Sequence, residues 1–337
     1  MGSVFVAFLG GIIPTVFYVS FVWWLDRYDK EPIWLLGLAF AWGAVPAALL
    51  AIAVEMAFDA SIALVAGEGL LADLASVSVS APLIEESAKG VALIALVLLF
   101  RRHFDNVLDG IVYGAMIGFG FALTENIFAY FLPILATAGL AAGLVNIFMR
   151  TVVFGFNHAF WTAIVGAAVG YARLSPQPLR RLFLPIAGWA TAVFLHGLHN
   201  AGASLVEQTL CLSLGLSLGV HWGGLALLIA VALMLGRRES QWIERGLAEE
   251  VRRGILTPHE FDLLRSAGHR QQVRWRALGL GGRPAYRAVG AYFQHATDLA
   301  FTRHHLRLLG DQGGDQAEIE RLQAVLVESR AEALPWL

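Results

Sequence analysis

The chain of 337 residues is 57% hydrophobic and only 15% charged, and its formal net charge is −2. Soluble domains carry roughly 25% charged residues, so this composition argues against an ordinary soluble protein. The near-neutral charge, with no basic block interleaved with aromatic residues, argues against a nucleic-acid partner. The sequence therefore predicts a protein that lies in a lipid bilayer.

Seven stretches are long and apolar enough to cross a bilayer as helices, which takes about 20 residues each. They cover approximately residues 4–25, 33–58, 79–100, 109–131, 151–171, 182–205 and 210–235. The segment 132–148 fits an outer loop, a re-entrant segment or an extra span. These stretches predict an all-α, polytopic membrane helix bundle, with a transmembrane domain over residues 1–236.

The remaining residues, 237–337, differ in composition from the rest of the chain. They are rich in arginine and glutamate and show helical periodicity broken by glycines. Thr257-Pro-His-Glu260 is typical of a helix start, with a threonine N-cap and a glutamate three residues later. Further helices are expected over residues 284–309 and 316–333. We predict a soluble, helical C-terminal tail.

The basic loop residues predict the orientation in the membrane. In the seven-span arrangement nearly all of them fall on one side, beginning with Arg27 and Lys30. The opposite loop, residues 59–78, carries acidic residues such as Glu68 and no lysine or arginine. By the positive-inside rule, the N-terminus lies outside and the tail is cytoplasmic. Arg150 is one basic residue on the other side, which the rule tolerates.

Ionisable and polar side chains interrupt four of the predicted spans, where inserting a charge costs at least ~2.5–3.5 kcal/mol. These residues are Glu85, Glu86 and Lys89 in the third span, Glu125 in the fourth, His158 in the fifth, and His196 and Asn200 in the sixth. One residue from each span lies about six to nine residues from its outer end, roughly 10 Å deep at about 1.5 Å per residue. This common depth favours one shared site.

The residue types in this layer suit hydrolytic chemistry. Lys89 follows Glu85 and Glu86 by one helical turn, so it can neutralise one glutamate while the other acts as a general base. Carboxylates and imidazoles from facing helices can position a water or hold a divalent metal, zinc above all. The candidate ligands, if a metal is used, are Glu86, Glu125, His158 and His196. Asn200 is a candidate oxyanion donor.

Each of these residues also has an ordinary structural explanation when taken alone. A Glu-Glu-x-x-Lys sequence can be a salt-bridged helix cap, Glu125 can make an interhelical hydrogen bond, and a lone histidine is more often a packing residue. We leave His199 out of the site and take Glu55 as interfacial. Only the common depth makes a functional site the better interpretation.

The motifs, in chain order, resemble those of the PrsW-type intramembrane proteases, within the wider group of CAAX-processing and bacteriocin-immunity membrane proteases. They read Asp26-Arg-Tyr-Asp-Lys-Glu-Pro32, Glu85-Glu-Ser-Ala-Lys89, Phe121-Ala-Leu-Thr-Glu-Asn126, His158 and His196-Gly197. The resemblance covers roughly residues 12–204. It implies a multi-pass protein of the bacterial cytoplasmic membrane that hydrolyses single-pass membrane proteins such as anti-sigma factors. Carried over by position, it makes Glu85 and Glu86 catalytic, with His196, Glu125 and His158 completing the site.

Residues and resemblance together predict an intramembrane endopeptidase, of metallo- or glutamic type, that cuts a membrane protein near the outer face. Whether a metal activates the water stays open, and the soluble zinc-protease signature His-Glu-x-x-His is absent after His259. Two alternatives remain. Buried glutamate, lysine and histidine also mark transporters and proton relays. A catalytically silent scaffold that signals through the tail, which could bind a cytoplasmic partner, would keep the same motifs.

Overall fold

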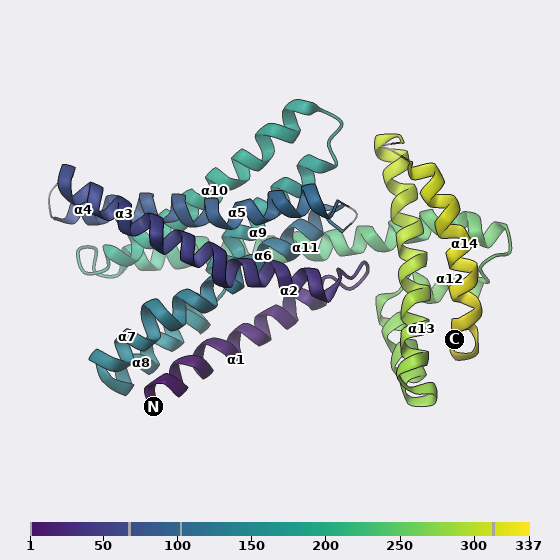
Figure 1. The fold of residues 1–337 in the computed structure, drawn as a ribbon, viewed down its shortest axis with the longest axis horizontal. Coiled ribbons are helices and arrows are strands. Elements are labelled where there is room, and N and C mark those ends of the chain that lie inside the picture. Colours follow the sequence, from purple (N-terminus) through teal and green to yellow (C-terminus); the bar gives the residue numbers. More distant parts are fainter. Residues whose placement is uncertain (1, 67–68, 102, 312–313) are drawn as a thin grey trace. The chain divides into compact units, whose positions relative to one another are not determined.

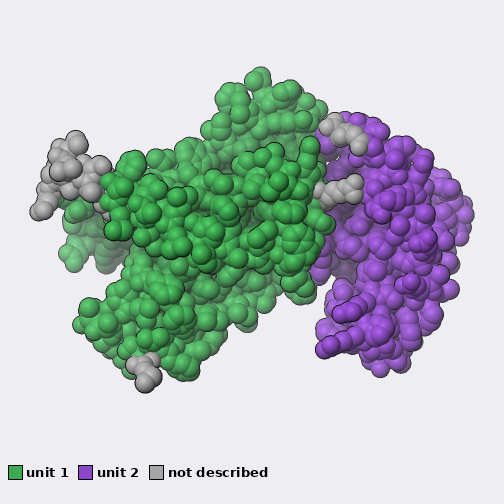
Figure 2. All heavy atoms as spheres, viewed as in Figure 1, with its two compact units in different colours: residues 1–25, 31–232 green, residues 26–30, 233–337 purple. Residues whose placement is uncertain are grey.

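The structure is a computed structural model that describes residues 2–66, 69–101, 103–311 and 314–337. Every secondary-structure element within these ranges is a helix (Figure 1). The prediction of an all-α, polytopic helix bundle is therefore confirmed. The chain forms two compact units, one of residues 1–25 and 31–232 and one of residues 26–30 and 233–337 (Figure 2).

The first unit contains the apolar helices. Its α-helices are α1 (Gly2–Leu25), α2 (Ile33–Trp42), α3 (Ala48–Ala66), α4 (Leu70–Ala75), α5 (Ala81–Leu99), α6 (Val107–Glu125), α7 (Leu132–Thr137), α8 (Gly139–Phe148), α9 (Asn157–Arg173), α10 (Pro178–Ser204) and the first part of α11 (Leu212–Arg252). Four short π-helical turns join some of them: η1 (Gly43–Ala47), η2 (Ser76–Ser80), η3 (Asn126–Phe131) and η4 (Met149–Val153).

The membrane spans agree with the prediction except in detail. Within the described residues, six helices are long and apolar enough to cross a membrane: Gly2–Leu25, Ile33–Phe58, Val107–Thr137, Gly139–Arg173, Pro178–Ser204 and Leu212–Arg252. The third predicted span, 79–100, is the one outside this set. It is helical over η2 and α5 but contains three ionisable residues, Glu85, Glu86 and Lys89. The predicted loop 59–78 is largely helical instead, with Glu68 outside the described residues.

The ambiguous segment 132–148 forms two short helices, α7 and α8, that make a hairpin beside α1 (Figure 1). Its apolar side chains continue a buried cluster in which Ala7 of α1 contacts Ile127, Phe131 and Leu135. Helix α7 extends α6 through η3, and α8 leads through η4 towards α9. The hairpin thus joins α6 to α9, and α9 itself begins at Asn157, within the longer apolar helix Gly139–Arg173.

Helix α6 is the core of this unit, since every residue from Leu108 to Ala122 is buried. It packs on α9 at backbone contact distance. A Cβ built on Gly110, Gly114 or Gly118 would lie 2.0–2.4 Å from a carbonyl oxygen of α9. Small residues at four-residue spacing allow such close approach of two helices. This packing fixes the end of α6 beside the start of α9.

Prolines explain three of the four π-helical turns. Pro46 lies inside η1, and Pro82 and Pro133 each follow η2 and η3 by two residues. A proline inside a helix lacks an N–H and clashes with the carbonyl four residues earlier, so a widened turn relieves the clash. Side chains then bind carbonyls in these turns, as Thr124 Oγ1 donates to Ala44 O at 2.5 Å.

The second unit contains the remainder of α11, α12 (Pro258–Leu264), α13 (Ala267–Leu309), α14 (Asp315–Ala333) and the 3₁₀ turn η5 (Leu334–Trp336). The predicted capping box at Thr257 is confirmed: its Oγ1 accepts from the Glu260 N–H at 3.2 Å, and its own N–H donates to Glu260 Oε2 at 2.8 Å. Helix α13 begins well before the predicted residue 284 and kinks at Gly282, where φ is 65°. The assignment of residues 237–337 as cytoplasmic stays a prediction.

The second unit also contains the loop between the first two helices, residues 26–30. Arg270, only 7% exposed, donates to Tyr28 O at 2.8 Å and to Thr297 Oγ1 at 2.9 Å. Gln294 Nε2 donates to Asp29 Oδ1 at 3.0 Å. Burial lowers the pKa of the Arg270 guanidinium to about 10, which Asp29 partly offsets. The loop therefore packs against the core of this unit, with Tyr28 half-buried, a feature that the sequence did not predict.

The α6–α9 contact predicts a strong difference between two glycine substitutions. In Gly114→Ala the new Cβ would lie 2.4 Å from Thr162 O, whereas around Gly90 nothing lies within 4 Å of the Cβ position. We expect Gly114→Ala to lower the free energy of unfolding by about 1–3 kcal/mol, the range for overpacked cores. Gly90→Ala should be neutral or slightly stabilising. Thermal unfolding in detergent measures both, and equal effects would contradict this packing.

Candidate active site

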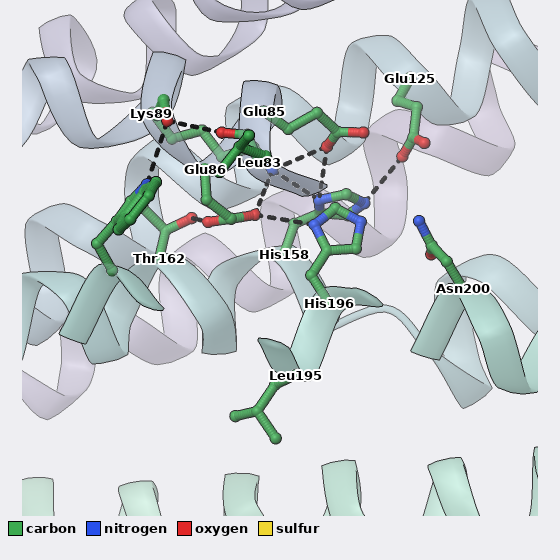
Figure 3. A network of polar contacts seen from close by, with 12 residues as sticks. Leu83, Glu85, Glu86, Lys89, Glu125, His158, Thr162, Leu195, His196 and Asn200 are labelled. Carbon is green, nitrogen blue, oxygen red and sulfur yellow. Dashed lines mark hydrogen bonds and ion pairs between the residues drawn. The ribbon is translucent and has the colours of Figure 1, made fainter. Parts of the chain in front are cut away.

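Four helices bring ionisable side chains into one network in the interior of the first unit (Figure 3). Helix α5 contributes Glu85, Glu86 and Lys89; the end of α6 contributes Glu125; the first turn of α9 contributes His158; and α10 contributes His196. Glu86 and Lys89 are 0% exposed. Six of the seven predicted site residues thus meet in one place, and their chemical roles stay predictions.

Lys89 is the centre of the network. Its ammonium donates to Glu85 Oε2 at 3.0 Å and to Glu86 Oε1 at 2.8 Å, and it lies 3.0 Å from His158 Nδ1. It also lies 3.8 Å from the centroid of the Phe121 ring. Two adjacent carboxylates in an apolar interior require such a counter-charge, because an isolated buried charge costs several kcal/mol even after relaxation.

The ammonium determines which nitrogen of His158 carries the proton. An ammonium can only donate, so Nδ1 of His158 accepts from Lys89 and the ring proton is on Nε2. Nε2 lies 2.9 Å from Glu125 Oε2, a carboxylate oxygen that accepts it. His158 is therefore held from both sides, with a lone pair towards Lys89 and an N–H towards Glu125.

Glu86 is fixed by three neighbours. Besides Lys89, His196 Nδ1 lies 3.1 Å from Oε1, and Thr162 Oγ1 donates to Oε2 at 3.3 Å. The His196 ring stacks on the Trp161 indole with centroids 3.9 Å apart and planes 14° apart. Because an ionised carboxylate only accepts, the His196 proton sits on Nδ1 and leaves Nε2 as a free lone pair.

A cavity of about 550 Å³ adjoins the network. Its described lining includes Glu85, Glu125, His158 and His196, whereas Glu86 and Lys89 lie behind these residues and are not part of the lining. Neighbouring glutamates thus have different positions. Glu85 faces space that a reacting group could enter, and Glu86 is enclosed by its partners.

Two carboxylates and two imidazoles are close enough to hold a metal. One ligand atom each from Glu85, Glu86, His158 and His196 lies within 4.8 Å of the others. The predicted ligand set had Glu125 in place of Glu85, but Glu125 lies on the far side of the His158 ring, at Nε2. In this structure the Lys89 ammonium occupies the space between three of these residues, and His196 Nδ1 faces Glu86. The donor types fit a zinc-like ion, which would have to displace the ammonium and bind His196 at Nδ1 with the ring proton on Nε2.

Asn200 lines the same cavity but does not join the network. Its Nδ2 donates to Val77 O at 2.8 Å, a carbonyl within the π-turn η2. In this arrangement the amide holds α10 to η2. The amide NH2 carries a second N–H besides the one that donates to Val77 O, and the predicted oxyanion role stays a prediction.

Arg150 belongs to the site, although the sequence suggested only a tolerated loop charge. From η4 it donates through Nη2 to Glu125 Oε2 at 2.6 Å and through Nε to Asn126 Oδ1 at 2.5 Å. A lone arginine inside an apolar stretch, eight residues before His158, was the available signal. Thr162 was also missed; it lies one helical turn after His158 and therefore on the same face. Glu55, expected to be interfacial, lines the cavity as well.

Comparisons with known proteins give one family and several related sequences. The sequence model of one family, described as PrsW family intramembrane metalloprotease, matches residues 31–239. The chain is 27% identical to Protease PrsW of Bacillus subtilis (strain 168) over 218 residues, 64% of this chain and 90% of that protein. It is 29% identical to Protease PrsW of Geobacillus kaustophilus over 194 residues, 56% of this chain and 76% of that protein. No solved structure matches.

The position of Lys89 predicts a large and partly reversible loss of stability. Lys89→Met leaves Glu85 and Glu86 without their counter-charge, and breaking a buried pair in this way costs about 3–5 kcal/mol. Adding Glu86→Gln removes one of the two charges and should restore part of that loss. Unfolding in detergent, monitored for wild type, both single variants and the double variant, measures this coupling. Strictly additive losses would show that the contacts of Lys89 carry no coupling energy.

Proposed function

This chain belongs to the PrsW family of intramembrane metalloproteases, and from that membership we propose that the network on α5, α6, α9 and α10 is its active site. It is a multi-pass membrane protease, and its substrates are membrane proteins. The observation that carries the assignment of the site is the joint placement of two glutamates and two histidines from three helices beside a cavity.

We assign the general base to Glu85, because it lines the cavity while Glu86 does not. The Glu85 carboxylate would take a proton from a water, and the water oxygen would form a bond to the carbonyl carbon of the substrate. The C–N bond then breaks as the same proton passes to the departing nitrogen. Lys89, which donates to Glu85 Oε2, would keep the carboxylate ionised and aimed at the cavity.

Glu86, His158 and His196 would hold the metal, which is the usual three-ligand set of a catalytic zinc site. When bound, zinc supplies a Lewis acid that polarises a carbonyl and acidifies a water. The chain's own residues orient these ligands. Thr162 binds Glu86, Trp161 stacks on His196, and Glu125 holds His158.

The developing negative charge on the carbonyl oxygen needs hydrogen-bond donors near the cavity. Asn200 lines that cavity, and its amide NH2 carries a second N–H besides the one that donates to Val77 O. We therefore retain it as the oxyanion donor.

The substrate must be extended where it is cut. An α-helix with its side chains is about 10–12 Å wide, which a cavity of about 550 Å³ does not admit over several turns. Breaking helical hydrogen bonds inside a bilayer is costly, so the cleaved stretch should be weakly helical. We propose a single-pass membrane protein resembling an anti-sigma factor, cut near the outer face.

The positive loop charges support the orientation that this proposal needs. They favour a bacterial cytoplasmic-membrane protein with the N-terminus outside and residues 237–337 in the cytoplasm. The tail unit has its own buried core, built around residues such as Leu247, Tyr292 and Leu326. We propose that it binds a cytoplasmic partner, because the residues of the network all belong to the first unit and leave the tail unit another role.

Substitutions of the two glutamates should separate base from ligand. Glu85→Gln is expected to abolish cleavage of tagged single-pass membrane proteins, by at least about 100-fold for a general base, while metal content stays that of wild type. Glu86→Gln should reduce both cleavage and metal content. Glu207→Gln, which changes an exposed glutamate, is the matched control. Activity in Glu85→Gln with loss in Glu86→Gln alone would move the base to Glu86.

Metal removal tests the metallo-type mechanism. We expect about one zinc per chain, loss of cleavage after chelation, recovery on zinc addition, and loss of bound zinc in His196→Ala. Elemental analysis of the purified protein, with the cleavage assay in parallel, provides both readouts. Cleavage that persists without metal would instead assign water activation to glutamate and histidine. Absence of cleavage for every candidate substrate, with ion flux in vesicles, would favour a transporter.

A further inference from the structure

Arg150 joins three groups beside the network. Its Nη2 donates to Glu125 Oε2 at 2.6 Å, its Nε donates to Asn126 Oδ1 at 2.5 Å, and its guanidinium lies 3.5 Å from the Tyr130 ring centroid. Glu125 and Asn126 are the last residue of α6 and the first of η3. The side chain therefore holds the point where α6 widens into a π-turn.

Glu125, held by Arg150, in turn holds the His158 ring. The same Oε2 that accepts from Arg150 accepts from His158 Nε2 at 2.9 Å. One oxygen thus receives donors from η4 and from α9, which fixes its position between them. A carboxylate that accepts the N–H of a metal-ligating histidine sets the ring orientation and the tautomer.

We propose that Arg150 is a positioning residue for the reaction: by holding Glu125 it fixes the orientation of the His158 ring, whose proton position Lys89 sets, and so keeps the Nδ1 lone pair facing the metal-ligand group. This inference rests on the proposed function for its consequence in catalysis. The chain of contacts Arg150–Glu125–His158 itself is independent of that function. Arg150 does not touch Lys89 or the glutamates of α5 in this chain of contacts, so it acts through Glu125.

The contact geometry requires an arginine. The guanidinium presents donors in a rigid, planar fork, so Nε and Nη2 reach Asn126 and Glu125 at the same time. Its flat face lies over Tyr130, which restricts rotation of the fork. A lysine would supply the charge from a single point and could not make both contacts in that plane. Charge alone is therefore insufficient.

The experiment compares Arg150→Met, Arg150→Lys and Glu125→Gln with Arg180→Met, which changes an exposed arginine. Zinc affinity is measured by competition with a chelator, and kcat and KM by cleavage of a tagged single-pass protein. Arg150→Met should weaken zinc binding by about 10–100-fold, the range for groups that orient metal ligands, and lower kcat more than KM. Arg150→Lys should recover part of the loss. The Arg150→Met/Glu125→Gln double variant should be no worse than the poorer single variant.

A second readout requires neither metal nor activity. In protein labelled with ¹⁵N-histidine, the His158 signal, identified by its loss in His158→Gln, should show the Nε2–H tautomer in wild type and Arg180→Met. In Arg150→Met the signal should keep that tautomer, which Lys89 sets, but should shift and broaden because the ring loses its fixed partner at Nε2. An unchanged His158 signal, or unchanged zinc affinity with a raised KM, would overturn the proposal. If wild type binds no metal and cleaves nothing, the proposed function fails while the His158 signal still tests Arg150.

Discussion

The arrangement depends on one ammonium group buried among two carboxylates. Without Lys89, the adjacent Glu85 and Glu86 would place two like charges in an apolar interior, which a helix bundle in a membrane does not tolerate. The same ammonium leaves only one ring nitrogen of His158 able to carry a proton. The ammonium that neutralises the glutamates of α5 therefore also determines that His158 of α9 accepts at Nδ1 and donates from Nε2. Glu125 of α6 is the acceptor of that N–H.

Close helix packing makes this compensation possible. The glycines of α6 let its backbone contact that of α9, and this contact brings the end of one helix to the start of the other. Widened turns then occur next to the network, at η2, η3 and η4. A π-turn shifts the side chains after it around the helix axis. The α6–α9 contact is tight along the middle of the helices, and the turns at the helix ends are widened. Together these two features leave room for a cavity beside well-packed helices.

Sequence patterns predicted the helices and the shared layer because both follow from where polar residues interrupt apolar runs. That pattern does not determine how each helix is rotated about its own axis. The sequence therefore could not show that Glu85 lines the cavity while Glu86 is enclosed. Arg150 was interpreted by counting loop charges, which assigns a side of the membrane and no partner. The hairpin of α7 and α8 was ambiguous because its helices are too short for hydropathy to separate them from a loop.

Residues 26–30 pack in the tail unit, so the tail is structurally tied to the loop that precedes the second membrane helix. The peptide bonds on either side of this loop lead directly into α1 and to Glu31, whose carboxylate accepts from Tyr113 Oη of α6 at 2.5 Å. The loop that packs in the tail unit therefore continues directly into α1 and into the residue that is hydrogen-bonded to α6, the helix that carries Glu125. Cutting the chain after α11 would not release a detachable module; it would strip the covering from Tyr28 and leave the first loop without its scaffold.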